Sequence, residues 1–212
     1  MPRVVDLTLP LTSGDRGVKI EPARRLETDG WNATTLSLYS HCGTHMDAPV
    51  HFGTGTQTID SITAEDFIGP AWVADVRPIE PHSLIKPEHL GDIAEKFKPG
   101  ESLLICTGWS EYYGQDKYRN ELPRVSLELV LWCAEKKVKM LGVEPPSVAD
   151  INDIDELTAI HQILFKSGVI VVEGLANLTS LSKPQVTFIV LPLKIANGDG
   201  APARAIAIED DD

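Results

Sequence analysis

Three of the six histidines in this 212-residue chain lie within residues 41–51, which read His-Cys-Gly-Thr-His-Met-Asp-Ala-Pro-Val-His. A metal site needs several donor atoms that converge, and imidazole nitrogen with carboxylate oxygen is the donor set of catalytic zinc or manganese. A loop at a strand end can direct side chains at alternate positions toward one point, and Gly43 permits an unusual turn there. The spacing therefore favours a metal centre over a polar surface loop with incidental histidines.

Other catalytic motifs are poorly supported by the sequence. The Gly and Pro within the segment disfavour a helix, so the spacing of His41 and His45 is not the helical HExxH arrangement of zinc proteases. The stretch 108–112, Gly-Trp-Ser-Glu-Tyr, lacks the second Gly of a serine nucleophile elbow. Gly-Thr-Gly at 53–55 lacks the third Gly of a dinucleotide fingerprint. Neither a serine hydrolase nor a dinucleotide enzyme is favoured.

Composition excludes several classes of protein. A net charge of −12 argues against nucleic acid as a partner, because phosphate binding needs clustered Lys and Arg. No apolar run approaches the ~20 residues that span a bilayer, so we expect no membrane insertion. The start of the chain lacks the apolar core of a signal peptide. Cys42, Cys106 and Cys133 form no CxxC pair, which argues against a disulfide framework and favours a cytoplasmic protein.

Alternating and helical hydrophobic patterns predict the elements that must position the histidine segment. Residues 12–30, rich in Gly and charge, are expected to form an exposed loop. Ser126 is a candidate N-cap for the helix that follows it. The expected strands are 4–9, 33–39, 72–76, 103–107, 140–143, 169–173, 188–191 and 205–208, and the expected helices are 87–97, 127–137 and 155–166. Strands and helices without a clear linker predict one mixed α/β domain over residues 1–212.

The histidine segment resembles the signature HxGTHxDxPxH of the cyclase family of metal-dependent hydrolases, which includes bacterial kynurenine formamidases and isatin hydrolases. Seven fixed positions in eleven make this a specific signal. The similarity continues through residues 103–109, 142–147 and 161–178. The resemblance implies a swivelling β/β/α arrangement within the α/β class. It also implies a homodimer or homotetramer.

The resemblance implies that His41, His45 and Asp47 ligate a divalent ion. His161 and Glu173 occupy the positions that complete a two-ion centre in related formamidases, with Asp47 and Glu173 as bridging ligands. The implied cofactor is Zn²⁺, as one or two ions, or Mn²⁺. Taken alone, His161 would be an ordinary helix histidine. Glu173 is more informative, because a carboxylate after Val-Ile-Val-Val is expected to be buried and then needs a cation or hydrogen bonds.

His51 is expected to have a different role from the ligands. The resemblance implies that the last histidine of the signature is the catalytic proton donor and acceptor. Cleavage of an amide leaves a poor leaving group that must be protonated, and a histidine with a pKa near 6.5 is suited to moving that proton. The alternative is a structural role beside the ligands.

The predicted function is hydrolysis of an amide or cyclic amide C–N bond in a small molecule by metal-activated water. The enzyme would be arylformamidase-like (kynurenine formamidase-like) or isatin hydrolase-like. A lactone hydrolase that uses the same centre is one alternative. A non-catalytic member of the fold that only binds metal or ligand is another.

The residues that bind the substrate stay open. Bacterial kynurenine formamidases carry a Trp-Pro-Gly-Asp-like stretch after the first strand, whereas residues 12–20 here contain neither Trp nor Pro. Arg16 or Lys19 could meet an acidic substrate, or could simply be solvated. Three aromatic residues after the strand at 103–107 are expected to line a pocket for a planar substrate, to pack in the core or to form an oligomer contact: Trp109, Tyr112 and Tyr113.

Overall fold

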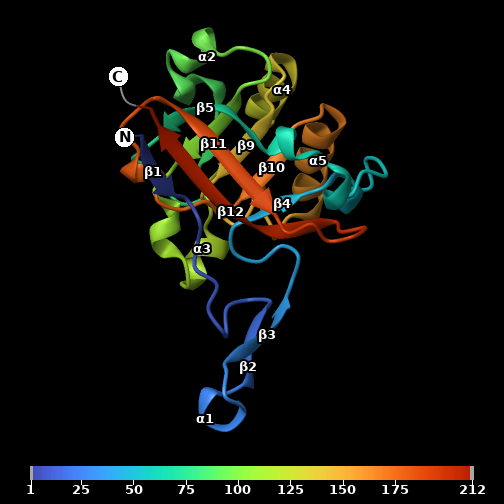
Figure 1. Ribbon diagram of the computed structural model, residues 1–212. Coiled ribbons are helices and arrows are strands. Elements are labelled where there is room, and N and C mark those ends of the chain that lie inside the picture. The colour runs from blue at the N-terminus through green and yellow to red at the C-terminus, as the bar shows by residue number, and fades with distance from the viewer. Residues whose placement is uncertain (1, 211–212) are drawn as a thin grey trace.

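A closed ring of seven strands organises the protein in a computed structural model, which describes residues 2–210 (Figure 1). The short strand β4 pairs with both β10 and β12 and thereby closes the ring, while β1 pairs with the other end of β12. In ring order the strands are β4 (His45–Asp47), β12 (Gly200–Glu209), β11 (Gln185–Pro192), β5 (Ile68–Asp75), β7 (Ser102–Cys106), β9 (Met140–Val143) and β10 (Ile170–Glu173), with β1 (Arg3–Asp6) outside it.

Strands β5, β7, β9 and β10 run parallel, and their side chains divide the core into two parts. Leu104 and Cys106 of β7 belong to the cluster that fills the ring, whereas Leu103 and Ile105 belong to the cluster beneath the helices. Successive side chains of a strand point to opposite faces, so a strand buried on both faces needs an unbroken apolar run. This is why β7 reads Ser-Leu-Leu-Ile-Cys.

Helices α4 (Leu127–Lys136) and α5 (Ile154–Lys166) cover the outer face of the ring (Figure 1). The hydroxyl of Ser126 accepts a hydrogen bond from the backbone N–H of Leu129, and Asp153 caps α5 in the same way, so both predicted helices are confirmed. Within residues 2–210 no helix has the length and apolar character to cross a membrane. The shorter elements are α2 (Ile93–Lys96), α3 (Asp116–Asn120), β6 (Leu84–Ile85) and β8 (Arg124–Val125).

The single helix predicted over residues 87–97 is wrong. The structure has a 3₁₀ turn at Pro87–Leu90 and the one-turn helix α2, separated by Gly91. Gly91 has φ 53° and ψ −135°, a conformation that glycine adopts easily and that no helix contains. The apolar spacing of a helix was present in the sequence, but the glycine interrupts it.

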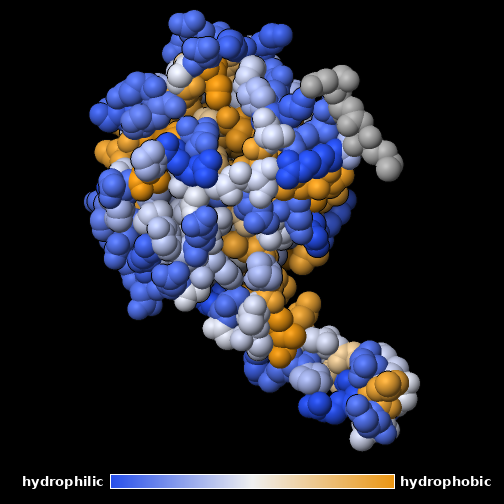
Figure 2. All heavy atoms as spheres, turned by 90° about the vertical axis from the view of Figure 1, so that its left-hand side faces the viewer, coloured by the Kyte–Doolittle hydropathy of each residue, from blue (hydrophilic) through white to orange (hydrophobic). Residues whose placement is uncertain are grey.

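The exposed loop predicted over residues 12–30 is also wrong. Strands β2 (Val18–Arg24) and β3 (Ala33–Leu38) form an antiparallel hairpin with α1 (Leu26–Asp29) at its tip, and this arm projects from the body (Figure 1). Most of its side chains are exposed on both faces, so no hydrophobic alternation marks β2 in the sequence. The arm nevertheless exposes hydrophobic surface, as Figure 2 shows. Its large exposed apolar side chains include Leu26, Trp31 and Leu36.

Gly174, directly after β10, lies against the backbone of the loop at residues 41–44, and a substitution there tests whether this close approach is required. Gly174 has φ +67°, and a Cβ there would collide with the carbonyl oxygen of Gly43. Gly168 has φ +76° but open space around it, so it is a matched control. We expect Gly168→Ala to lower the free energy of unfolding by about 1–2 kcal/mol, the cost of a left-handed alanine.

Gly174→Ala should cost clearly more than its control, because it also forces two backbone segments apart. Urea unfolding of both variants measures the difference. Equal losses of stability would show that the contact between Gly174 and Gly43 is not a constraint.

Candidate metal centre

The short strand β4 carries two of the predicted ligands on one face. His45 and Asp47 are separated by one residue and therefore point the same way, while Met46 between them packs inside the ring. Pairing with β10 sets His45 directly opposite Glu173. All three polar side chains thus lie on the outer face of the ring, the face that α5 covers.

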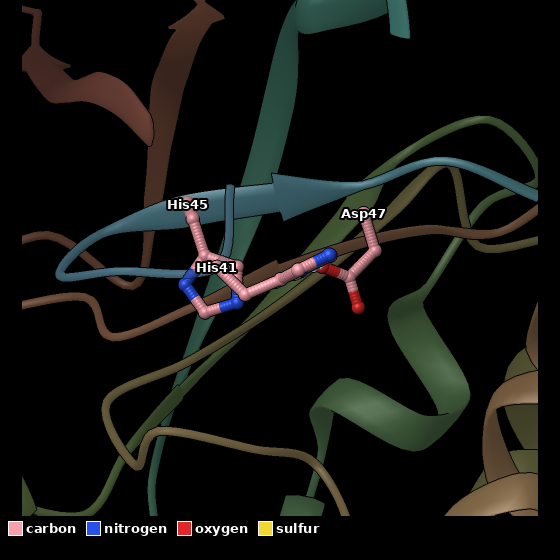
Figure 3. Close-up of side chains that lie close together, drawn as sticks. All are labelled: His41, His45 and Asp47. Atoms are coloured by element: carbon pink, nitrogen blue, oxygen red, sulfur yellow. Dashed lines mark hydrogen bonds and ion pairs between the residues drawn. The ribbon is translucent and has the colours of Figure 1, made fainter. Parts of the chain in front are cut away.

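The first histidine of the segment folds back onto this strand. His41 Nδ1 lies 2.7 Å from Asp47 Oδ1, and His45 Nε2 lies 3.6 Å from the same oxygen (Figure 3). On the other side, His45 Nε2 lies 3.2 Å from Glu173 Oε2. Three segments of the chain therefore meet at two buried carboxylates.

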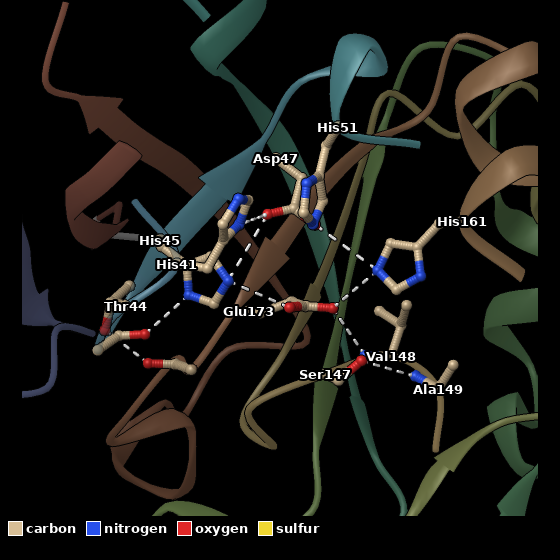
Figure 4. A network of polar contacts seen from close by, with 12 residues as sticks. His41, Thr44, His45, Asp47, His51, Ser147, Val148, Ala149, His161 and Glu173 are labelled. Atoms are coloured by element: carbon tan, nitrogen blue, oxygen red, sulfur yellow. Dashed lines mark hydrogen bonds and ion pairs between the residues drawn. The ribbon is translucent and has the colours of Figure 1, made fainter. Parts of the chain in front are cut away.

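Helix α5 supplies the remaining predicted ligand. His161 Nε2 lies 3.3 Å from Glu173 Oε1 and 3.6 Å from Asp47 Oδ2 (Figure 4). The rings of His161 and Phe52 stack with their centroids 4.3 Å apart. The structure thus brings together all five residues predicted as ligands, although His161 and Glu173 are more than a hundred residues from the segment.

Backbone carbonyls fix the tautomer of two of these histidines. His45 Nδ1 donates to the carbonyl oxygen of Gly43 at 2.9 Å, and His161 Nδ1 donates to that of Leu157 at 2.7 Å. A carbonyl can only accept, so Nδ1 carries a proton in both rings and Nε2 faces the carboxylates. Metal-ligating histidines are oriented in this way by an acceptor on the second nitrogen.

The donor set fits divalent ions. Donor atoms within 4.8 Å of one another define two buried or nearly buried groups that share Asp47, one with His41 and His45 and the other with His161 and Glu173. Asp47 and Glu173 are 2% and 4% exposed, and in the described part of the chain they form ion pairs only with histidines. Two buried carboxylates without Lys or Arg are costly unless cations neutralise them.

The pKa values of the metal-free site show the same need for positive charge. The five residues predicted as ligands are called the cluster below: His41, His45, Asp47, His161 and Glu173. Burial disfavours the protonated ring of His41, but contacts with Asp47 and Asp199 outweigh it and raise its pKa from 6.5 to about 9. Burial opposes ionisation of Glu173, but hydrogen bonds from His161 and His45 hold the pKa of its carboxyl far below the usual range. Protons on the histidines act here as the counter-charge that a metal ion would supply.

His51 differs from the five residues of the cluster in its exposure. It lies in the 3₁₀ turn Pro49–Phe52 after β4, and its side chain is 26% exposed, against 9% for His41. Its ring stacks on that of His41 with centroids 3.9 Å apart. Burial lowers the pKa of His51, so the ring is neutral near neutral pH.

Asp199 is a residue of the candidate site that the sequence did not reveal. Its Oδ2 lies 3.0 Å from His41 Nε2 and 3.6 Å from His51 Nδ1, so it could also form a metal-binding group with these two histidines. Asp199 lies in the turn before β12, and the pairing of β12 with β4 carries it to the histidines. An Asp between two glycines is typical of a turn, so the local sequence did not identify Asp199 as part of the site.

A cavity of about 450 Å³ opens onto the cluster, a volume suited to a small molecule. Its walls come from the cluster, from the base of the arm and from the region around α3. Tyr113 lines it and donates a hydrogen bond to Asp15, whereas Trp109 packs in a small core cluster and donates to the carbonyl of Tyr118. The aromatic residues predicted together therefore divide between cavity wall and core.

Comparison with known proteins agrees with this fold and site. The model of the Cyclase family, described as "Putative cyclase", matches residues 5–150. The chain belongs to this family. Among relatives, the kynurenine formamidase of Salinibacter ruber is 34% identical over 185 residues (87% of this chain, 84% of that protein). That of Bacillus thuringiensis (strain Al Hakam) is 31% identical over 211 residues, which cover 95% of each chain.

Solved structures confirm the fold that the family resemblance implied. Isatin hydrolase A from Labrenzia aggregata superimposes with a TM-score of 0.87 at 26% identity, covering 99% of this chain and 94% of that one. Isatin hydrolase A from Ralstonia solanacearum gives a TM-score of 0.86 at 27% identity, covering 99% and 92%. The α/β, cyclase-like arrangement thus extends over almost the whole chain.

The raised pKa of His41 predicts how the stability of the metal-free protein depends on pH. Its folded-state pKa of about 9 exceeds the unfolded value of 6.5, so the folded protein binds the extra proton between these values. The free energy of unfolding should therefore fall as pH rises from 6.5 to 9, by at most about 3 kcal/mol.

In saturating metal the free energy of unfolding should instead rise from pH 6.5 to 9, because metal binding requires neutral histidines and strengthens as they lose protons. Urea unfolding at both pH values, in chelator and in excess Zn²⁺, measures the two slopes. A metal-free protein whose stability is flat or rises over this interval would contradict the charge assignment of the cluster.

Proposed function

We propose that this protein is a metal-dependent hydrolase that cleaves an amide or cyclic amide C–N bond of a small molecule, in the manner of an arylformamidase. The observation that carries the proposal is a buried cluster of carboxylates and oriented histidines beside a small cavity. Relatives named kynurenine formamidase and isatin hydrolase support an enzyme of this class.

The proposed ligands are the five residues of the cluster. His41, His45 and Asp47 would hold one divalent ion, and His161 and Glu173 would hold a second that shares Asp47. Imidazole with carboxylate suits Zn²⁺ and Mn²⁺ alike. A divalent ion bound here supplies Lewis acidity and a strong nucleophile from water at neutral pH.

His51 is the proposed general base and acid. It is neutral near neutral pH, so it can accept a proton as attack on the carbonyl begins. It can then donate that proton to the nitrogen of the breaking C–N bond, which otherwise leaves poorly. The contact of its Nδ1 with Asp199 favours a ring orientation with Nε2 free.

Variants of His45 and His51 distinguish the role of metal ligand from that of general base and acid. His45→Ala should lose bound metal and activity together, whereas His51→Ala should keep its metal and lose about 10²- to 10⁴-fold in kcat. His89→Ala, an exposed histidine outside the site, is the control and should change neither. Elemental analysis and turnover of formamide, isatin-like and lactone substrates are the measurements.

Full metal content in His45→Ala would refute the ligand assignment. Turnover only of lactones would favour the lactonase alternative. Bound metal without any turnover in this panel would favour a non-catalytic binding protein.

We further propose that residues 1–212 act as one cyclase-like hydrolase domain in the cytoplasm, as a homodimer or homotetramer. Cys42, Cys106 and Cys133 are unpaired and buried, as suits a reducing compartment. The arm supports self-association, because an isolated two-stranded hairpin is marginally stable in water. The occupant proposed for its apolar side chains is a second copy of the chain.

Polar substitutions on the arm test the oligomer. Trp31 and Leu36 are 57% and 58% exposed, and the double variant Trp31→Ser/Leu36→Ser should shift the protein to monomers. Leu131→Ser, equally exposed at 52% on α4, is the control and should leave the assembly unchanged. Light scattering coupled to size exclusion measures the mass. A monomeric parent protein, or an unchanged double variant, would refute the arm as the interface.

A further inference from the structure

Two arginines line the cavity beside the metal centre, and neither has a counter-ion in the described part of the chain. They are Arg16, in the loop before β2, and Arg119, in α3. The sequence has eight arginines, and five of them form ion pairs with carboxylates: Arg3, Arg24, Arg77, Arg124 and Arg204. The remaining one, Arg25, is exposed on the arm.

Arg119 is half-buried, which makes an unpaired guanidinium costly. Burial lowers the pKa of Arg119, and the nearby positive charge of Arg16 lowers it further. Two guanidinium groups therefore repel each other across the cavity wall. Like charges are brought together in this way at low cost only when an anion lies between them.

Three of the four acidic residues in the cavity wall are already engaged, and the fourth, Asp116, is exposed at the start of α3 and forms no ion pair with either arginine in residues 2–210. Asp15 accepts hydrogen bonds from the Tyr113 hydroxyl and from the backbone N–H of Thr12, both at 2.8 Å. Asp47 and Glu173 contact the histidines of the cluster. The arginines thus form a local positive site on a protein whose net charge is −12, and which would otherwise repel an anion.

The arginines are also within reach of the chemistry. The same cavity of about 450 Å³ is lined by Arg16, Arg119 and the cluster, and the charge of Glu173 influences the pKa of Arg119. One small molecule can therefore meet the metal centre with its amide and the arginines with another group. Guanidinium groups bind carboxylates through paired, charge-assisted hydrogen bonds.

We infer that Arg16 and Arg119 bind a carboxylate of the substrate, so that the enzyme acts on amides that carry a free carboxylate in addition to the scissile C–N bond. This inference rests on the proposed hydrolase function and adds the substrate class. The loop before β2 lacks the Trp of the Trp-Pro-Gly-Asp-like stretch described above and contributes a cation, Arg16, to the cavity. This difference agrees with the inference.

Matched substrates test the inference on the metal-loaded enzyme. N-formylanthranilate and formanilide contain the same aryl formamide, and only the first has a carboxylate. We expect kcat/KM to be at least tenfold higher for N-formylanthranilate. Arg119→Gln should lower that value about 10- to 100-fold, mainly through KM, and should thereby reduce the ratio of kcat/KM between N-formylanthranilate and formanilide.

Arg119→Lys should restore part of the preference, because it keeps the charge but not the planar fork. Arg16→Gln should act in the same direction, and the double variant should abolish the preference. Arg204→Gln removes one surface arginine outside the cavity and controls for net charge. Metal content and thermal stability of each variant show that the site is intact.

The outcomes distinguish this inference from the proposed function. Equal hydrolysis of the two substrates by the parent enzyme, or an Arg119→Gln variant that keeps the preference, overturns the inference and leaves the hydrolase standing. If neither substrate is hydrolysed, the proposal that the protein hydrolyses aryl formamides fails. Calorimetric binding of benzoate then decides the inference, which requires weaker binding in Arg119→Gln and is overturned by equal binding.

Discussion

Strand β4 is only three residues long, yet the site depends on its pairing with β10 on one edge and β12 on the other. That double pairing closes the ring and fixes the register that places His45 opposite Glu173. A slip of one residue would turn His45 and Asp47 into the ring and Met46 toward the cavity. The hydrophobic interior, which accepts Met46 and excludes charges, therefore enforces the geometry of the polar face.

The same register creates an electrostatic problem that the fold itself does not solve. Asp47 and Glu173 are buried, and among residues 2–210 only histidines contact them as possible cations. Such a cluster is stabilised either by protons on the histidines or by metal ions, and the two compete for the same nitrogens. The carbonyls that hold Nδ1 of His45 and His161 favour the metal, because they leave Nε2 free to coordinate. Stability and function are thus coupled through one set of atoms.

The cavity wall opposite the candidate metal centre is built from different elements than the centre itself. The cluster is built on the rigid ring and on α5, whereas the opposite side of the cavity comes from the base of the arm and from α3. Surface segments of this kind can change their side chains without disturbing the ring. Family members can therefore share the ligands and differ in what they recognise. The pair Arg16 and Arg119 in place of an aromatic contact would be one such difference.

Much of the local structure was determined by the sequence alone. Helices α4 and α5 followed from their apolar period and caps, and the buried strands followed from their apolar runs. The donor-rich segment was recognisable because its predicted ligands are neighbours in the chain, and family resemblance added His161 and Glu173 to the prediction. The hairpin arm and the break at Gly91 were missed, since an exposed strand has no hydrophobic pattern and one glycine can override a helical period.

Tertiary structure decided what depends on distant segments. It placed Asp199 beside His41 through the pairing of β12 with β4, and it brought Arg16 and Arg119 to one cavity. Local sequence does not predict such contacts between distant segments, because the residues around a turn aspartate or a surface arginine are the same whether or not the fold places it at a site. The identity of the donors was therefore set by sequence, whereas their convergence and the charge facing the substrate were set by strand register and by the closure of the ring.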